Sequence, residues 1–311
     1  LYKISLGTKL AQAQLMRRHD GKAFRPDRSA ILLGEGELRL PEKGLTVAVA
    51  LPKFNADPWQ ALFSGEAAQT QVQTPAQGGM ALSQVVIKTP KLQLLGRELN
   101  QVDLNLRPRE GGWQIGLNMR EAVGELIWRS AGEGVLEGRL RRLVLRPTAE
   151  VMSAPVNPML NSLPGMNLTV DALFLGEKPL GQLELKARND KGAWQLDTLN
   201  IKNPDGNLRS HGIWRNTGRQ QMHLDFELTA TDLGKLLDRL GHGESVRRGT
   251  GSLSGNVDWN GPPTAIDYPS LSGNLLVSAE KGQFNKLEPG VGKLLGLLSL
   301  QSLSRRLTLD F

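Results

Sequence analysis

The 311-residue chain contains no cysteine. This absence excludes a disulfide scaffold, a thiolate metal site and a cysteine nucleophile, and it agrees with an oxidising compartment without proving one. Histidine is also scarce, and the four present are not spaced as metal ligands: His19, His211, His223 and His242. The string GSLSG at residues 251–255 has leucine where a serine hydrolase has its nucleophile. We therefore expect no metal, no cofactor and no enzymatic activity.

Aromatic residues make up only 5% of the chain, and the net charge is +7, from 38 Lys and Arg against 31 Asp and Glu. A nucleic-acid surface combines basic residues with aromatics for base stacking. The strongest basic string, RLRRLVLR at residues 139–146, lies apart from the tryptophans, so we expect no nucleic-acid partner. We interpret it as a solvated face or a contact for anionic lipid headgroups.

Asp225 and Glu227 share the polar face of one strand. Alternating charges on a solvent-exposed strand face explain these two acids, so we do not expect them to act as a catalytic acid–base pair.

Long hydrophobic runs are missing too. The longest, at residues 290–300, is about half of the roughly 20 residues that a membrane-spanning helix needs. The chain starts at Leu1 rather than at methionine, and an alternating pattern runs to Phe311. These features predict a fragment of a longer protein that does not itself span a bilayer.

The dominant pattern that is present is period-two alternation, which predicts strands with one apolar and one polar face. It recurs around residues 45–51, 102–106, 113–119, 183–187, 222–228, 253–259 and 307–311. Turn sequences of Asn, Asp and Gly separate such runs at residues 109–112, 189–192, 203–206 and 215–218. Alternating runs joined by such turns predict an antiparallel meander.

Helices are expected to be few, short and amphipathic. Asp57 and Pro58 begin one near residues 57–63. Asp232 begins a second near 232–240, with a leucine stripe and a stop at Gly241. A third is expected near 289–303, as a structural cap on the sheet, a plug or a membrane contact.

Internal repetition indicates a repeated sheet module, since residues 94–115 resemble residues 174–196, with a shared Leu-Gly start and Trp-Gln end. We predict three parts. These are a curved sheet segment over 1–146, a Pro-rich connection over 147–167 and a second curved sheet segment over 168–311.

The apolar strand faces need a partner, because three short helices cannot cover them. A folded-over sandwich would bury them against each other, whereas a curved trough would present them to a ligand. The inward residues are mostly Leu and Val, and an aliphatic lining suits acyl chains, which bind through dispersion and apolar burial. The scarcity of aromatics therefore favours the trough.

The closing segment, residues 282–311, with its Pro-Gly helix start, Leu-rich run and final RRLTLDF, resembles the C-terminal region of the YhdP branch of the AsmA-like envelope proteins. The repeated SLSGN strands and the two strand-then-helix segments that contain Asp57 and Asp232 resemble that branch as well. The resemblance implies an all-β fold, in which a long, strongly curved antiparallel sheet forms a hydrophobic groove of the β-taco, bridge-like lipid-transfer type.

The function that the resemblance implies is phospholipid transport between inner and outer membrane, which maintains the outer-membrane permeability barrier. It places a monomeric chain in the periplasm of a Gram-negative bacterium, anchored in the inner membrane by an N-terminal helix outside this chain. By position, the groove lining would be Val47, Val49, Leu51, Val102, Leu104, Leu106, Trp113, Ile115, Leu117, Leu183, Leu185, Leu224, Phe226, Leu228, Val257, Trp259, Leu275 and Val277. Headgroup or membrane contacts are expected from Arg139, Arg141, Arg142, Arg305 and Arg306.

Two rival functions stay open at this point. A structural or assembly factor would hold unfolded outer-membrane strands at its sheet edges. An envelope hydrolase on a β-scaffold would need a catalytic constellation that the sequence does not display.

Overall fold

A computed structural model of the chain describes residues 1–59, 80–145, 163–241 and 246–284, apart from 9, 20, 22, 95, 191, 216, 217, 219 and 282. The chain divides into two compact units. Unit 1 comprises Leu1–Val144 and Thr148–Asn161, and unit 2 comprises Leu145–Pro147 and Ser162–Phe311. The Pro-rich connection expected at 147–167 stays a prediction, because most of it lies outside the described residues.

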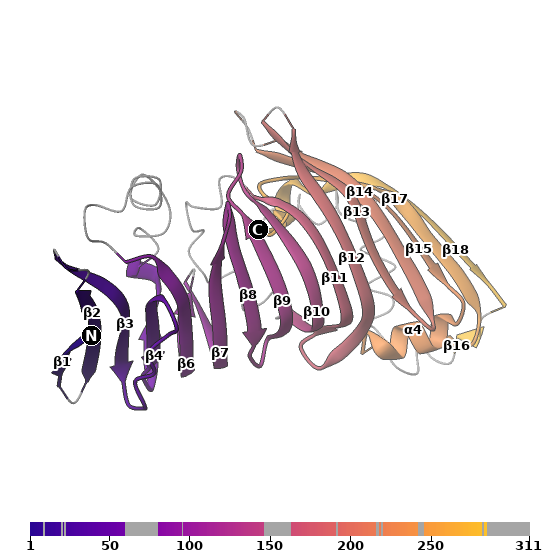
Figure 1. Cartoon of the computed structure of the whole chain (residues 1–311). Coiled ribbons are helices and arrows are strands. Elements are labelled where there is room, and N and C mark those ends of the chain that lie inside the picture. Colours follow the sequence, from indigo (N-terminus) through magenta and orange to yellow (C-terminus); the bar gives the residue numbers. More distant parts are fainter. Residues whose placement is uncertain are drawn as a thin grey trace, which may run out of the picture. The chain divides into compact units, whose positions relative to one another are not determined.

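Ten strands make up the described part of unit 1 (Figure 1). They are β1 (Tyr2–Gly7), β2 (Ala11–His19), β3 (Phe24–Gly34), β4 (Gly44–Ala50), β5 (Lys53–Asn55), β6 (Leu82–Leu94), β7 (Arg97–Arg109), β8 (Gly112–Asn118), β9 (Ala122–Arg129) and β10 (Val135–Leu145). β1 to β3, and β6 to β10, pair with their sequence neighbours in antiparallel register. The alternation at 45–51, 102–106 and 113–119 thus correctly predicts β4, β7 and β8.

Three pairings of unit 1 depart from the predicted antiparallel order, because β3–β4, β4–β6 and β5–β6 are parallel. Tight hairpin turns join only antiparallel neighbours, whereas parallel neighbours need a chain crossover. The longer connections at residues 35–43 and 56–81 allow such crossovers. Alternation predicts which face of a strand is apolar but not the direction of its partner, so the sequence pattern could not distinguish these pairings.

Unit 2 is an antiparallel meander in which consecutive strands of the main ladder pair. Its strands are β11 (Gly165–Leu175), β12 (Lys178–Asp190), β13 (Ala193–Asn203), β14 (Gly206–Arg215), β15 (Gln221–Ala230), β17 (Thr250–Asn260) and β18 (Ser272–Glu280). The short strands β16 (Val246–Arg247) and β19 (Gln283–Phe284) form a separate antiparallel pair. The turn sequences at 189–192, 203–206 and 215–218 join β12 to β15, as predicted.

The described residues contain one α-helix, α4 (Leu233–Arg239), and two short 3-10 turns, η1 (Asp57–Trp59) and η3 (Tyr268–Ser270). Asp232 caps α4, because its carboxylate accepts a hydrogen bond from the Lys235 backbone N–H at 3.0 Å. Gly241 follows the helix with a φ of 85°, a conformation that favours glycine. The second predicted helix is thereby confirmed. The third, at 289–303, and most of the first lie outside the described residues.

Glycines permit close approach of the backbones of neighbouring strands at two positions. Gly124 of β9 has a φ of 154°, and a Cβ atom there would lie 2.4 Å from the Arg139 carbonyl oxygen of β10. At Gly273 of β18 the corresponding distance to the Asn256 carbonyl oxygen of β17 is 2.0 Å. No side chain fits at either position, so glycine is required there.

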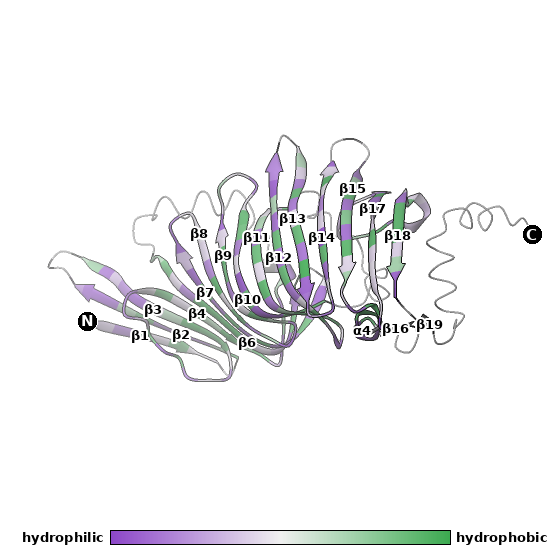
Figure 2. Ribbon diagram, turned by 90° about the vertical axis from the view of Figure 1, so that its right-hand side faces the viewer, coloured by the Kyte–Doolittle hydropathy of each residue, from purple (hydrophilic) through white to green (hydrophobic). Residues whose placement is uncertain are grey.

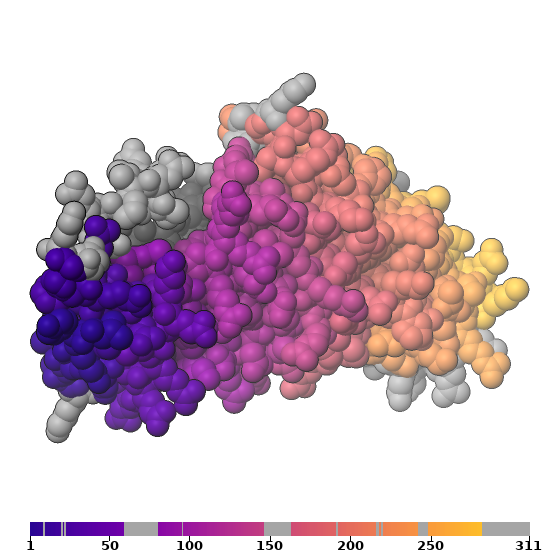
Figure 3. Space-filling model, in the orientation of Figure 1, coloured from indigo at the N-terminus to yellow at the C-terminus, as the bar shows by residue number. Residues whose placement is uncertain are grey.

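The fold class is therefore all-β, as predicted, with 17 strands in the main ladders of the two units and one short α-helix in the described residues. Neighbouring strands lie against one another on the face of each unit that Figure 3 presents. Their backbone hydrogen bonds are satisfied within the ladders, which leaves the question of what covers the two faces of each ladder.

Candidate functional site

The cross-strand register of unit 2 gathers its predicted lining residues on one face, which we call the apolar face of unit 2. Residues paired across an antiparallel ladder point to the same side of the sheet. One row runs through Leu183, Ile201, Leu208, Leu228, Leu253 and Val277. The next row runs through Leu185, Leu199, Ser210, Phe226, Gly255 and Leu275, and a third includes Leu224 and Val257. Apolar and polar bands alternate along these strands in Figure 2.

Much of this face is only partly covered. Leu185, Leu224, Phe226 and Leu228 are half-buried, and Val277 is 50% exposed. Contiguous, partly exposed apolar rows are uncommon on a soluble protein and indicate a binding surface. The middle of the apolar face of unit 2 is thus only partly covered by the described residues.

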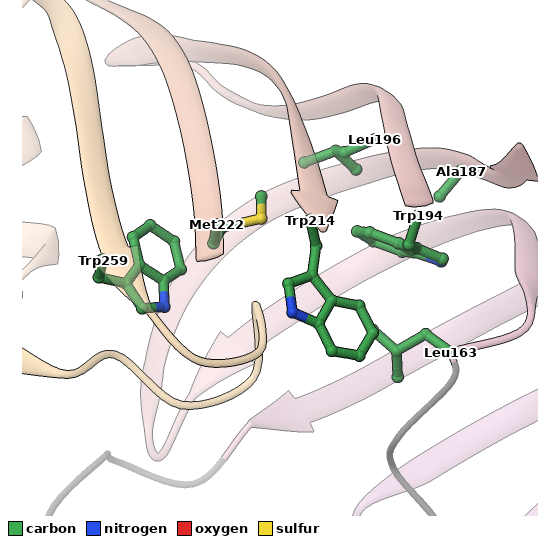
Figure 4. Close-up of a cluster of buried hydrophobic side chains, with 7 residues drawn as sticks. All are labelled: Leu163, Ala187, Trp194, Leu196, Trp214, Met222 and Trp259. Carbon is green, nitrogen blue, oxygen red and sulfur yellow. The ribbon is translucent and has the colours of Figure 1, made fainter. Parts of the chain in front are cut away.

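One end of the face is closed by a tryptophan cluster (Figure 4). Trp214 is fully buried between Trp194 and Met222, which are its register partners on β13 and β15. The indole N–H of Trp194 donates to the Pro164 carbonyl at 2.9 Å. Trp259, predicted as lining, belongs to this packed cluster with 4% exposure, so it is core instead of open surface.

Helix α4 packs near the opposite ends of the same strands. Buried Leu236 lies against Gly206, where a Cβ atom would come within 3.2 Å of its side chain. The Arg239 guanidinium forms an ion pair with the buried carboxylate of Asp205. The Lys178 ammonium donates to the Leu240 carbonyl at 2.7 Å and so satisfies the C-terminal end of the helix. These contacts fix α4 to the strand ends.

Unit 1 gathers its predicted lining residues in the same manner, on what we call the apolar face of unit 1. One row contains Val47, Val85, Leu106 and Ile115, and the next contains Val49, Ile87, Leu104 and Leu117. Trp113 stands in a further row beside Trp128 of β9. Leu51 lies just beyond the end of β4 and is half-buried.

Part of the apolar face of unit 1 is packed core. Leu92, Val102, Leu104, Met119 and Ala122 form a buried cluster, and Phe54 and Ala56 pack against it. Leu104 is 6% exposed and Val49 is 4% exposed. The segment around β5 therefore covers residues that alternation alone marks as open lining.

The predicted headgroup arginines separate into different environments. Arg139 is paired in register with Glu125, whereas Arg141 and Arg142 line a concavity of about 610 Å³ together with Arg120. Arg305 and Arg306 lie outside the described residues. Sequence analysis missed Arg120, since it lies in the β8–β9 turn and belongs to no basic string.

A second concavity, of about 410 Å³, lies over the polar face of unit 2 and includes His211, Asp225 and Glu227. His223 Nδ1 is 2.8 Å from an Asp258 carboxylate oxygen, and its Nε2 is 3.2 Å from Asp225. The hydrogen bond to Asp258, with the charges of Asp258 and Asp225, raises the pKa of His223 above its usual 6.5, against the opposite effect of burial. The Asp225 carboxylate thus lies between the imidazole groups of His211 and His223, in agreement with its interpretation as a charge on the polar face of the strand without a catalytic role.

Two absences concern only the part of the chain that the structure describes. No group of three or more His, Cys, Asp or Glu is arranged there to hold a metal ion. No helix there has both the length and the apolar character to cross a membrane.

Comparison with known proteins adds two findings. A protein-family model described as "YhdP protein" matches residues 1–311. The chain is 23% identical over 321 residues to the "Intermembrane phospholipid transporter YhdP" of Escherichia coli (strain K12). That alignment covers 98% of the chain and 24% of the relative, so the chain spans about a quarter of the relative's length.

Proposed function

The chain belongs to the YhdP protein family, as its resemblance predicted, and from this premise we propose that its apolar faces bind phospholipid acyl chains. The observation that carries the proposal is the set of half-buried aliphatic rows on unit 2, from Leu183 to Val277. The relative whose printed name is intermembrane phospholipid transporter supports the same ligand class.

The proposed mechanism is passive. Acyl chains lie along the aliphatic rows, where each buried methylene contributes at most about 0.8 kcal/mol without any directional bond. Since neighbouring rows offer equivalent contacts, a chain moves from one to the next with little change in free energy. Polar headgroups stay in water, close to arginines such as Arg141, and no covalent chemistry is required.

We place this activity in the periplasm of a Gram-negative bacterium, between inner and outer membrane, with an inner-membrane anchor outside this chain. The word "intermembrane" in the relative's name supports the location. Continuous delivery of phospholipid would maintain the permeability barrier of the outer membrane. The residues proposed to line the path in unit 2 are Leu183, Leu185, Leu224, Phe226, Leu228, Val257, Leu275 and Val277.

The test places a photo-crosslinking amino acid at Phe226 or Leu228, with Thr229 on the polar face of the same strand as the matched control. After irradiation in cells, mass spectrometry identifies the adduct. We expect phospholipid at Phe226 and Leu228 and none at Thr229. Protein adducts alone, or no adduct at the two apolar positions, would contradict the proposal.

A role in outer-membrane protein assembly is the second candidate, and the strand β18 favours it. β18 is the last strand of the unit 2 meander, where it pairs with β17, and its Leu276 is 70% exposed. An exposed strand edge can pair with an incoming strand. A crosslinker at Leu276 that captures outer-membrane protein, with no lipid captured at Phe226, would favour this function over lipid binding.

A further inference from the structure

The concavity of unit 1 is a built site on the polar face of its sheet. Asp103, Asn118, Val123 and Arg142 are successive register partners across β7, β8, β9 and β10, so their side chains share this face. The lining comprises Gln101, Asn118, Met119, Arg120, Val123, Arg141 and Arg142. Three guanidinium groups and two amides thus surround about 610 Å³.

Two irregularities of the backbone bring these side chains together. Gln101 has a φ of 53°, in the left-handed region that few residues other than glycine adopt. Arg141 is the extra residue of a bulge in β10, because Leu140 pairs with Gly124 and Arg142 with Val123. Bulges re-aim side chains, and strained residues concentrate at functional sites. Two lining residues of the concavity, Gln101 and Arg141, therefore lie at positions where the backbone departs from regular strand geometry.

The positive charge of this concavity is not neutralised from within. In the part of the chain that the structure describes, Arg120 and Arg141 make no ion pair, and Arg142 donates to the Arg120 carbonyl. The nearby acids are engaged elsewhere, since Asp103 pairs with Lys88 at 3.3 Å and Glu121 accepts two hydrogen bonds from Asn100. Three neighbouring guanidinium groups, with no acid among the described lining residues of the concavity, attract an anion.

The concavity of unit 2 provides the contrast. It also contains an arginine, Arg209, but Asp197, Asp225 and Glu227 line it too, and His211 lies 3.5 Å from the Asp225 carboxylate. His211 and Asp225 thus pair on that surface, and three acids stand beside its one arginine. Of these two concavities, the one in unit 1 is suited to an anion.

We propose that Arg120, Arg141 and Arg142 form a binding site for a phosphate group, with Gln101 and Asn118 as amide hydrogen-bond donors. The planar guanidinium offers two parallel N–H donors that match phosphate oxygens. The identity of the phosphate as a phospholipid headgroup rests on the proposed function, whereas the anion site itself stands on the geometry above.

Isothermal titration calorimetry of the 311-residue chain tests the site. The probes are dihexanoyl-phosphatidylglycerol below its micelle concentration and inorganic phosphate. The test variant is Arg120→Gln/Arg141→Gln. The control, Arg97→Gln/Arg107→Gln, removes the same charge from exposed positions of β7 outside the concavity. We expect a loss of affinity of at least about tenfold in the test variant and less than about twofold in the control.

Each outcome decides a separate claim. Loss in the test variant alone supports the site, and the source is the lipid if phosphatidylglycerol binds more tightly than inorganic phosphate, or free phosphate if the order is reversed. Equal loss in both variants, or no binding of either probe, overturns the site. Because acyl-chain crosslinking at Phe226 does not depend on these arginines, failure of the phosphate site and failure of the proposed function remain distinguishable.

Discussion

The two units carry the same kind of apolar face and bury different parts of it. In unit 1 the buried cluster lies around Leu104 and Met119, near the β8–β9 turn, and Trp113 and Trp128 are half-buried. In unit 2 the buried cluster is the tryptophan end itself, where Trp214 is fully buried. The repeat aligns Trp113 with Trp194, so equivalent residues have different environments. Covering segments outside the repeated strands decide which part of an apolar face becomes core.

The covering segments explain the difference physically. In unit 2, Leu163 packs on the tryptophans and Pro164 accepts the Trp194 indole N–H. In unit 1 the residues of the β5 segment, Phe54 and Ala56, pack against the buried cluster that contains Leu92 and Leu104. Each segment adds apolar burial at one end of its face and leaves the rest half-covered. The comparison therefore separates the buried residues that stabilise each unit from the half-covered residues that are candidate ligand contacts.

The largest expected effect tests that separation directly. Leu104→Asp places an unpaired carboxylate in a packed cluster and should lower the free energy of unfolding by about 4 kcal/mol. Phe226→Asp, in a half-open row, should cost less than about 1.5 kcal/mol. Urea unfolding followed by circular dichroism measures both. Equal destabilisation by the two substitutions would mean that unit 2 is packed in the same way as unit 1, which would support the sandwich.

The tryptophans of the two units provide the next test. Trp214→Ala removes a fully buried indole and should cost about 3 kcal/mol. Trp128→Ala, at a half-buried position of unit 1, should cost about half of that. Thermal or urea unfolding of the two variants gives the values. A larger loss of stability in Trp128→Ala than in Trp214→Ala would mean that the tryptophans of unit 1, and not those of unit 2, lie in packed core.

Capping of α4 has a smaller effect that concerns unit 2 alone. Asp232→Ala removes the side-chain acceptor of the Lys235 N–H and should destabilise the helix by about 1 kcal/mol. Faster amide hydrogen exchange at Leu236 would report the loosened helix. Asp238→Ala, exposed on the same helix, is the control and should leave exchange unchanged. Unchanged exchange in Asp232→Ala would show that the contacts of Leu236, Arg239 and Lys178 hold α4 without the cap.

The smallest expected effect is the pH dependence of His223. Its pKa is raised in the folded chain, so the stabilisation is fully present below about 6.5 and is lost as pH rises through the folded value. Because the side chain is one-third exposed, the contribution should be about 0.5 kcal/mol or less. Urea midpoints at pH 6 and pH 8 measure the difference, and His223→Gln should remove it. A wild-type chain that gains stability from His223 with rising pH would contradict the sign.

Local pattern predicted β4, β7, β8, β12, β15 and β17 and several of the turns, because alternation and the Asn, Asp and Gly turns are local physical signals. The alternating run at 307–311 lies outside the described residues. Asp232 and Gly241 predicted both ends of α4 for the same reason. The parallel position of β4 was missed, since strand direction depends on long connections. The burial of Leu104 and Trp259 was missed as well, since it depends on segments distant in sequence.

The candidate phosphate site shows the same limit. Arg141 and Arg142 were visible in a basic string, but Arg120 joins them only because the β8–β9 turn lies beside β10. Conversely, Arg139 belongs to the string and not to the concavity. Proximity in the sequence therefore grouped Arg139 with the site wrongly and could not identify Arg120 as part of it.

The glycines at which neighbouring strands approach closely have a thermodynamic consequence. At Gly124 and Gly273 the spacing of the strands is set by backbones in close approach, without any contribution from a ligand. A binding face that is shaped by its own chain is preorganised, so little conformational entropy is lost when a ligand settles on it. Alanine at either position would force the two strands apart, and the affinity of the proposed lipid-binding faces would then fall even though every residue proposed to contact lipid is unchanged.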